Sequence, residues 1–260
     1  FSHAAGGDRL MRSFFRIVFI LALFSVSAKA ADPARVIFDR MLKACDENKS
    51  GRMNLHSFER LTNGKLAESS MLVKYVTSPK KIYLYCVKPN AGTEALFRKG
   101  WINDKLFINP SGFPFVNVKM SPFSPLVRKD THHTIYQIGF DYIAGMIHFY
   151  ASQYGDKFYR YLQLKDTIEF DNRKLIHLKY EFKEFQQIRY TVQMHETVSQ
   201  IADKFHLNDY SILLLNPDVG DYDHVKPGQV IRIPNFYNRR VDFFIDMATW
   251  LPLIQEVYDD

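Results

Sequence analysis

The sequence lacks the marks of several protein classes. It has no block of like charges: the formal charge is +6, and it is +3 without residues 1–30, which hold four basic residues and one acidic residue. The sequence therefore has no basic cluster of the kind that binds the phosphates of nucleic acid. No H-E-x-x-H, G-x-S-x-G or P-loop pattern occurs, so the common motifs of metalloproteases, serine hydrolases and nucleotide-binding proteins are missing.

Cysteine is scarce as well. The chain has two, Cys45 and Cys86, and no His/Cys cluster, so we expect no metal site and no cofactor. The adjacent His132 and His133 would point in opposite directions on a strand, which hinders binding of one metal ion by both, and a loop position is favoured. No catalytic Cys/His pair can be inferred, because no histidine lies near Cys86 in the sequence.

Carboxylates are the remaining candidates for catalysis. Glu169, Asp171, Glu181 and Glu184 fall in a strand-and-turn region. A glycosidase uses such a pair, but solvated faces and cross-strand ion pairs are the simpler interpretation of this context. We therefore predict a protein that is not an enzyme and has no catalytic residues.

Residues 1–30 have the three parts of a secretory signal peptide. A short basic start leads into the apolar run Ile17–Phe24, and Ala28-Lys29-Ala30 forms an A-x-A cleavage site before Ala31. The apolar run is well short of the roughly 20 residues that span a bilayer. We expect translation to start at Met11, with Phe1–Leu10 as upstream sequence, and cleavage after Ala30. This predicts an exported protein of the periplasm or cell envelope that is not integral to the membrane.

Export makes a disulfide between the two cysteines permissible. Cys45 ends a helical run and Cys86 lies in a strand-like run. A helix packed on a sheet can bring them together, and two buried free thiols are the alternative. No cysteine directly follows the expected cleavage site, which argues against a lipid-anchored product.

From Ala31 to Gln187 strand patterns dominate, separated by Gly, Pro and Asn turns. An amphipathic helix is expected before them at Asp32–Asn48, and another among them at Tyr136–Tyr150. The expected strands are Met53–Leu61, Ser70–Thr77, Lys81–Val87, Glu94–Arg98, Lys105–Ile108, Phe158–Leu164, Thr167–Phe170 and Leu175–Phe182.

The pattern changes after Gln187. A strand at Tyr190–Val192, helices at Glu196–Phe205 and Tyr210–Leu215, and a strand at Val230–Pro234 form a small strand–helix–helix–strand unit. Strand patterns then return, at Val241–Met247 and Leu253–Tyr258. We predict a small module inserted into a loop of a larger sheet domain.

The residues of this unit resemble the LysM family over about residues 188–236. Tyr190–Ala202 resembles the family's opening strand and turn, Leu214–Pro217 the end of its second helix, and Val225–Pro234 its closing "L-x-P-G-Q-x-L-x-I-P" segment. There are two departures. Met194-His195 stands where a glycine is common, and Val219–His224 is longer than usual.

LysM modules bind polymers that contain N-acetylglucosamine, chiefly peptidoglycan in bacteria. The resemblance implies a shallow groove between two loops that offers backbone N–H and C=O groups to acetamides and hydroxyls. The groove residues it implies are His195, Glu196 and Thr197 on one side and Asn216, Pro217, Asp218 and Val219 on the other. Thr197 is equally suited to cap its helix and Asn216 to close its own.

The rest of the chain, residues 31–187 and 237–260, more distantly resembles the LolA/LolB-type periplasmic lipoprotein-carrier superfamily. The corresponding elements are the leading helix, Ser78–Leu84, Lys99–Leu106 and Asp246–Leu253, and the stretch Lys88–Leu96 is similar to an uncharacterised bacterial envelope family. The resemblance implies an α+β fold, with a curved antiparallel half-barrel covered by helices and an inserted βααβ LysM module. Such folds continue beyond the equivalent of Asp260, so we expect a truncated chain.

These patterns predict an exported envelope protein that binds peptidoglycan or a related N-acetylglucosamine polymer, with a sheet domain that binds an apolar ligand such as a lipid or a lipoprotein acyl chain. A tunnel lined by Phe97, Phe107 and Phe115 would favour this carrier. The alternative is a cell-wall-processing enzyme that LysM targets, which converging carboxylates or a Cys–His contact would favour. A filled core with neither feature would indicate a structural spacer.

Overall fold

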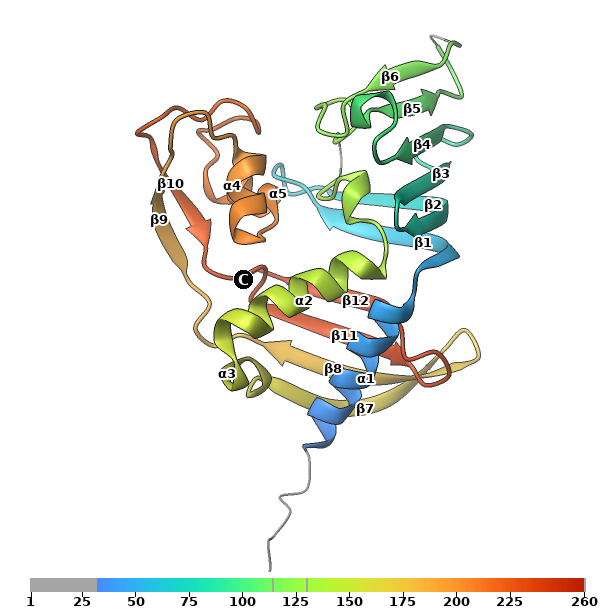
Figure 1. Cartoon of the computed structure of the whole chain (residues 1–260), viewed down its shortest axis with the longest axis vertical. Helices are drawn as coiled ribbons and strands as arrows, with labels where there is room; N and C mark the ends of the chain where they lie inside the picture. Colours follow the sequence, from blue (N-terminus) through green and yellow to red (C-terminus); the bar gives the residue numbers. More distant parts are fainter. Residues whose placement is uncertain (1–31, 114, 130, 260) are drawn as a thin grey trace, which may run out of the picture. The chain divides into compact units, whose positions relative to one another are not determined.

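The computed structural model describes residues 32–113, 115–129 and 131–259, so the expected start site, signal peptide and cleavage site lie outside the described residues. Asp32–Asp260 forms one compact unit (Figure 1). Within the described ranges, no helix has the length and apolar character needed to cross a membrane.

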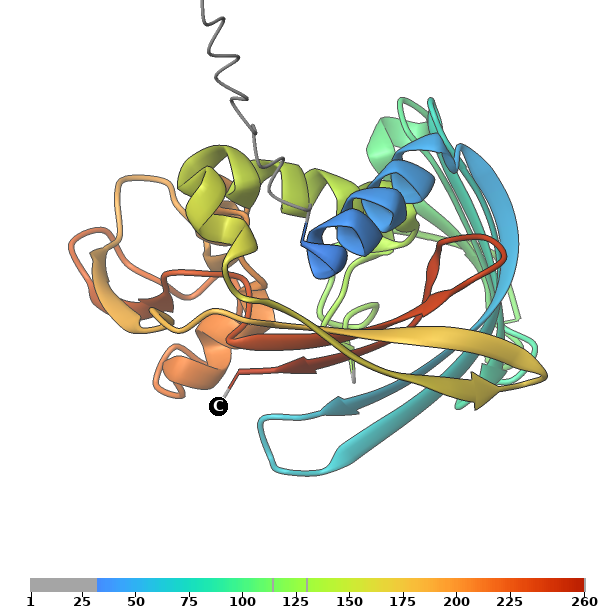
Figure 2. The same ribbon diagram turned by 90° about the horizontal axis from the view of Figure 1, so that it is seen from below.

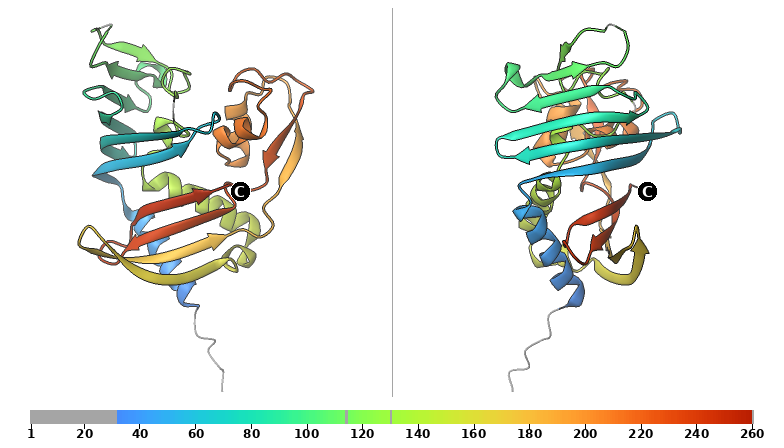
Figure 3. Two further views of the ribbon diagram at one scale, coloured as in Figure 1. Left: turned by 180° about the vertical axis from the view of Figure 1, so that it is seen from behind. Right: turned by 90° about the vertical axis from the view of Figure 1, so that its right-hand side faces the viewer.

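A six-stranded antiparallel sheet is built from strands that follow one another in the sequence (Figure 3). They are β1 (Ser50–Arg60), β2 (Leu66–Thr77), β3 (Lys80–Lys88), β4 (Glu94–Arg98), β5 (Leu106–Asn109) and β6 (Val118–Met120). Gly64, with φ +78°, turns the chain between β1 and β2 in a conformation that costs glycine little. Along β2, Val73 and Tyr75 are buried while Lys74 is exposed, because successive side chains point to opposite faces.

A second, four-stranded antiparallel sheet has the order β12-β11-β8-β7. Its strands are β7 (Leu162–Phe170), β8 (Arg173–Glu181), β11 (Arg240–Asp246) and β12 (Pro252–Tyr258). The helices α1 (Pro33–Glu47) and α2 (Phe140–Tyr154) lie over one face of this sheet (Figure 2). Asp32 caps α1 by accepting a hydrogen bond from the Ala34 N–H at 3.0 Å.

The core between these helices and the sheet is dominated by large side chains. Phe38 and Met41 of α1 pack with Leu178 of β8, with Phe182 directly after β8 and with Phe243 of β11. All five side chains are almost fully buried. Burial of such a side chain contributes roughly 1.5–3 kcal/mol. A void of about 30 Å³ remains beside Phe38, room for little more than one water molecule.

The inserted module has a core of its own. It consists of β9 (Gln187–Thr191), α4 (Val198–Phe205), α5 (Asp209–Leu215) and β10 (Val230–Pro234), and β9 pairs antiparallel with β10. Glu181 at the end of β8 lies directly opposite Arg240 at the start of β11, so the module occupies the connection between two neighbouring strands. This confirms the expected α+β fold with an inserted βααβ module, although the strands outside the module form two sheets.

The helix expected at Tyr136–Tyr150 was placed about four residues early. Residues Ile135–Gln137 form a separate 3-10 turn, η2, in which Thr134 and Gln137 form a capping box. Gly139, with φ +114°, then separates this turn from α2. A second 3-10 turn, η1, spans Ile102–Asp104.

Three strand predictions were also wrong in detail. Gly155 ends α2 and begins a one-turn helix, α3 (Asp156–Tyr159), so Phe158 is helical. The two strands expected around Leu164 and Thr167 are one strand, β7, with an irregular register between these residues. The short strand β6 was not expected, because prolines and glycines surround it.

The structure shows neither a disulfide between the two cysteines nor a tunnel lined by the three phenylalanines, within the residues that it describes. Cys45 is buried on α1 and Cys86 is half-buried on β3, and both are free thiols, so they do not form a disulfide. Phe97 is buried, Phe107 packs on Trp101, and Phe115 is 77% exposed, so these three residues do not line one tunnel.

Candidate functional site

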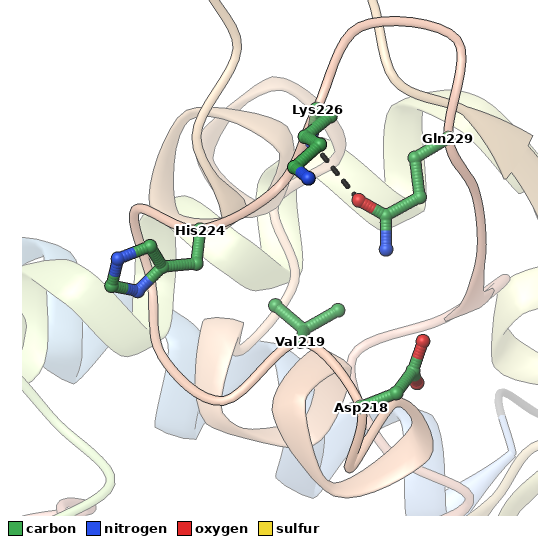
Figure 4. Close-up of a pocket in the computed structure, with 5 residues that line it drawn as sticks. All are labelled: Asp218, Val219, His224, Lys226 and Gln229. Carbon is green, nitrogen blue, oxygen red and sulfur yellow. Dashed lines mark hydrogen bonds between the residues drawn. The ribbon is translucent and has the colours of Figure 1, made fainter.

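A pocket of about 580 Å³ lies in the module, within the connection from α5 to β10 (Figure 4). Asp218 and Val219 follow α5, His224 and Lys226 lie in the loop, and Gln229 directly precedes β10. Val219 is 4% exposed and forms an apolar floor, whereas Asp218, His224 and Lys226 are exposed. The lining thus combines one apolar contact with several polar groups.

A tight turn shapes one wall of the pocket. Gly228 has φ +82°, and its N–H donates to the Val192 carbonyl at 2.9 Å, which ties the turn to the end of β9. The Gln229 side chain accepts a hydrogen bond from the Lys226 N–H through Oε1 at 3.0 Å. Its Nε2 group therefore remains as a donor on the pocket side (Figure 4).

The long loop forms the opposite wall, and Asp221 organises it. The Asp221 carboxylate accepts hydrogen bonds from the N–H groups of Asp223 at 2.9 Å and His224 at 3.1 Å. The Asp223 bond, followed by the His224 contact at 2.5 Å, lowers the pKa of Asp221 below its usual range. Asp221 therefore stays ionised and orients the His224 ring. Tyr222 anchors the loop to α4, because its carbonyl accepts from the Val198 N–H at 2.9 Å.

Of the seven residues expected in the groove, only Asp218 and Val219 line this pocket. His195 and Pro217 are exposed elsewhere on the loops of the module. His195 has φ +63°, which explains the glycine common at this point of LysM sequences, since glycine adopts this backbone conformation readily.

The other three expected groove residues hold the module together. Thr197 caps α4 and forms a capping box with Gln200. Asn216 is 6% exposed; its amide donates to the carbonyls of Ile212 and Arg232 at 2.7 Å each, and its Oδ1 accepts from the Arg232 N–H at 2.8 Å. It thus links α5 to β10, with both amide N–H donors in use and one bond accepted by the amide oxygen.

Glu196 is occupied in the same way. Its carboxylate accepts from the Gln193 N–H and from Tyr190 at 2.8 Å, and from Lys204 at 3.0 Å. Burial acts to raise the pKa of Glu196, but these hydrogen bonds outweigh it and lower the pKa. Glu196 is therefore ionised, and it links Tyr190 of β9 to Lys204 of α4.

Sequence reasoning missed three pocket residues, His224, Lys226 and Gln229. The signals were present: Lys226 and Gln229 belong to the closing segment of the LysM resemblance, and His224 ends the stretch that is longer than usual. Among the described residues, no group of three His, Cys, Asp or Glu side chains is arranged to hold a metal ion.

Comparison with known proteins places the chain in a family. Residues 50–204, more than half of the chain, match the family described as "Protein of unknown function (DUF1571)". The chain belongs to the DUF1571 family. Residues 190–234 of this DUF1571 protein match the LysM domain, which confirms the expected module. No curated protein matches the chain.

Two solved structures are similar to this DUF1571 protein. A DUF1329 family protein from Desulfovibrio piger ATCC 29098 has 12% identity and a TM-score of 0.33, with 88% of this chain and 75% of that chain covered. A putative outer membrane lipoprotein-sorting protein domain from Vibrio parahaemolyticus has 11% identity and a TM-score of 0.32, with 86% and 71% covered.

Proposed function

We propose that this DUF1571 protein is exported and binds peptidoglycan, or a related N-acetylglucosamine polymer, through its LysM module. The observation that carries the proposal is the coincidence of the LysM match at residues 190–234 with a pocket inside that segment. The protein then acts as a binding protein of the cell envelope.

The pocket chemistry suits a sugar chain. Gln229 Nε2 and the Lys226 ammonium group donate to hydroxyl and acetamide oxygens, and Asp218 accepts from a hydroxyl. The Val219 methyl groups contact an acetamide methyl. In this proposal His195 and Pro217 extend the contact surface, while Glu196, Thr197 and Asn216 fix the loops that present it.

Sedimentation with purified peptidoglycan tests the glycan proposal. We expect Asp218→Ala with Lys226→Ala to lower the affinity about tenfold or more, since each lost hydrogen bond to a charged group is worth roughly 1.5–3 kcal/mol. The matched control is Asp223→Ala with Arg189→Ala, which removes the same charges from exposed positions outside the pocket lining. Equal sedimentation of both double variants would place the glycan elsewhere.

Export is the second part of the proposal, and it rests on the three-part N-terminus. N-terminal sequencing of the protein from an envelope fraction should begin at Ala31. Recovered protein that retains Arg16 to Ala30 would contradict this expectation.

A second candidate function concerns the sheet domain, which we propose contacts an apolar ligand such as a lipid or an acyl chain. Beside the buried core of the six-stranded sheet, a row of apolar side chains is only half-buried, namely Met53, Leu55, Met71, Leu84 and Ile108. Each CH₂ group buried there would contribute about 0.8 kcal/mol. Protein from its native host should carry extractable lipid that an apolar fluorophore displaces; lipid-free protein that also ignores the fluorophore would refute this role.

A further inference from the structure

The outward face of the six-stranded sheet carries a row of side chains that crosses all of its strands. Each member of this cross-strand row lies directly opposite the next one in the strand pairing. The row consists of Arg52, Lys74, Tyr83, Leu96, Phe107 and Lys119, in the order β1 to β6. Lys74 is exposed while its neighbours Val73 and Tyr75 are buried, so the row lies on the face away from the core. No helix lies over this face in the right-hand view of Figure 3.

The centre of the cross-strand row is apolar. Leu96 is 37% exposed, and Tyr83 and Phe107 on either side of it are half-buried. Trp101 packs on Phe107 with ring centroids 6.2 Å apart and is itself 38% exposed. A chain molecule that lies along the row would bury this apolar surface.

Cations stand at the ends of the row and along one side of it. Arg52 and Lys74 lie directly opposite each other on β1 and β2. Lys81 and Arg98 form a second opposed pair, on β3 and β4, one step along the same face. Like charges directly opposite each other destabilise a sheet. Since β2, β3 and β4 are inner strands, protection of a sheet edge does not explain these cations.

The acidic residues on this sheet do not neutralise these cations. Glu94 lies on the same face, one row along, and accepts hydrogen bonds from Tyr83 and, at 3.0 Å, from Asn109. Glu68 and Asp104 pair with lysines outside the row. Five exposed cations therefore form no ion pair with any residue that the structure describes, namely Arg52, Lys74, Lys81, Arg98 and Lys119.

We propose that this face binds a linear acidic polysaccharide, with sugar rings on Tyr83, Leu96 and Phe107 and anionic groups on the flanking cations. The C–H faces of sugar rings pack on aromatic and aliphatic side chains, and lysine and arginine bind carboxylates through charged hydrogen bonds. Insertion into a bilayer needs apolar side chains that project into it, whereas these lie between longer lysine and arginine side chains. The choice of a glycan over another polyanion rests on the envelope function proposed above. This contact is separate from the LysM pocket.

Calorimetric titration of an oligogalacturonate into the chain that starts at Ala31 tests the proposal, because each of its sugar rings carries a carboxylate. We expect saturable binding that weakens as the salt concentration rises. Lys81→Ser with Arg98→Ser should lower the affinity about tenfold or more, since two charged hydrogen-bond donors are lost. This variant should melt no lower than the parent, because it removes a like-charge pair.

The matched control is Arg160→Ser with Lys165→Ser. It removes the same charges from exposed positions at and before β7 of the other sheet, and it should bind as the parent does. Leu96→Ser tests the apolar centre of the row. We expect it to weaken binding while leaving the salt dependence unchanged, because no charge is lost.

Three outcomes would overturn the proposal. They are no saturable heat with the parent chain, equal affinities of the charge variant and its control, and equally tight binding of polyphosphate or of single-stranded oligothymidylate, which lack a sugar chain with carboxylates. A neutral N-acetylglucosamine oligomer probes the LysM pocket separately, and its binding should be the same in the Lys81/Arg98 variant and the parent. Failure of the LysM proposal is therefore distinguishable from failure of this one.

Discussion

Arg128 and Asp209 form a buried, bidentate ion pair that attaches the LysM module to the rest of the unit. Arg128 Nη1 and Nη2 donate to the Asp209 carboxylate at 2.9 and 2.6 Å, and the two side chains are 1% and 8% exposed. The guanidinium also lies 3.5 Å from the centre of the Tyr222 ring. Arg128 follows β6 and Asp209 begins α5, so the module is docked on the protein that surrounds it.

Removing one partner of this pair should be costly. Arg128→Ala leaves the Asp209 charge buried without its partner, and we expect a loss of about 3–5 kcal/mol in the free energy of unfolding, measured by urea denaturation. Arg35→Ala is the control, because Arg35 pairs with Asp156 at an exposed site and should change stability little. Similar losses from both substitutions would show that the buried pair does not secure the module.

A second contact with α5, between His132 and Tyr210, makes stability depend on pH. Its ring stacks on Tyr210 with centroids 4.0 Å apart, and its Nε2 lies 2.8 Å from the Arg60 carbonyl. Burial lowers the pKa of His132 below its ordinary value of 6.5, more than the nearby Glu59 carboxylate raises it. The unfolded chain therefore takes up this proton first, and stability should fall as the pH drops below 6.5.

His132→Phe keeps an aromatic ring against Tyr210 but removes this titration. Denaturation midpoints measured above and below pH 6.5 should differ less in this variant than in the parent chain. An unchanged difference would mean that other groups cause the pH dependence.

Asn216 should matter for folding more than for glycan contact. Asn216→Ala removes two hydrogen bonds to Arg232 of β10 and one to Ile212 of α5, and it leaves buried backbone groups without partners, so we expect a loss of about 2–4 kcal/mol. Hydrogen exchange of Val230–Pro234 should accelerate, while Asn117→Ala at an exposed loop position should leave it unchanged. A stable Asn216→Ala protein with weakened peptidoglycan binding would return Asn216 to the groove.

The two thiols should differ in reactivity. Burial, with a smaller effect of Asp46, raises the pKa of Cys45 to about 12, so this thiol stays protonated and shielded. A thiol reagent at mildly alkaline pH should label one cysteine in the folded protein and two in denaturant, and Cys86→Ser should abolish the native label. Labelling of Cys45 in the folded variant would show that α1 opens.

The LysM module was predicted well because its signals are local. Thr197 and Asn208 cap its helices, and the segment from Lys226 to Gln229 turns the chain before β10. The same local signals did not indicate whether Thr197 and Asn216 bind a ligand or hold the fold. That distinction depends on burial and hydrogen-bond partners, which appear only once α5 and β10 are placed together.

Long-range packing accounts for most of what the sequence left open. Arg128 and Asp209 are 81 residues apart, and neither has a local pattern that pairs them. Phe115 was expected to line a tunnel with Phe97 and Phe107, yet its turn presents it to solvent. Phe158 alternated like a strand residue, but Gly155 starts a helical turn before it, so backbone conformation overrode the side-chain pattern.

The central claim is that the LysM pocket binds an N-acetylglucosamine polymer, and calorimetric titration of a soluble N-acetylglucosamine oligomer into the chain from Ala31 tests it most directly. We expect saturable heat that is retained by Asp223→Ala with Arg189→Ala and lost or strongly weakened by Asp218→Ala with Lys226→Ala. The absence of saturable heat with the parent chain at millimolar oligomer, or its full retention in the pocket variant, would contradict the account.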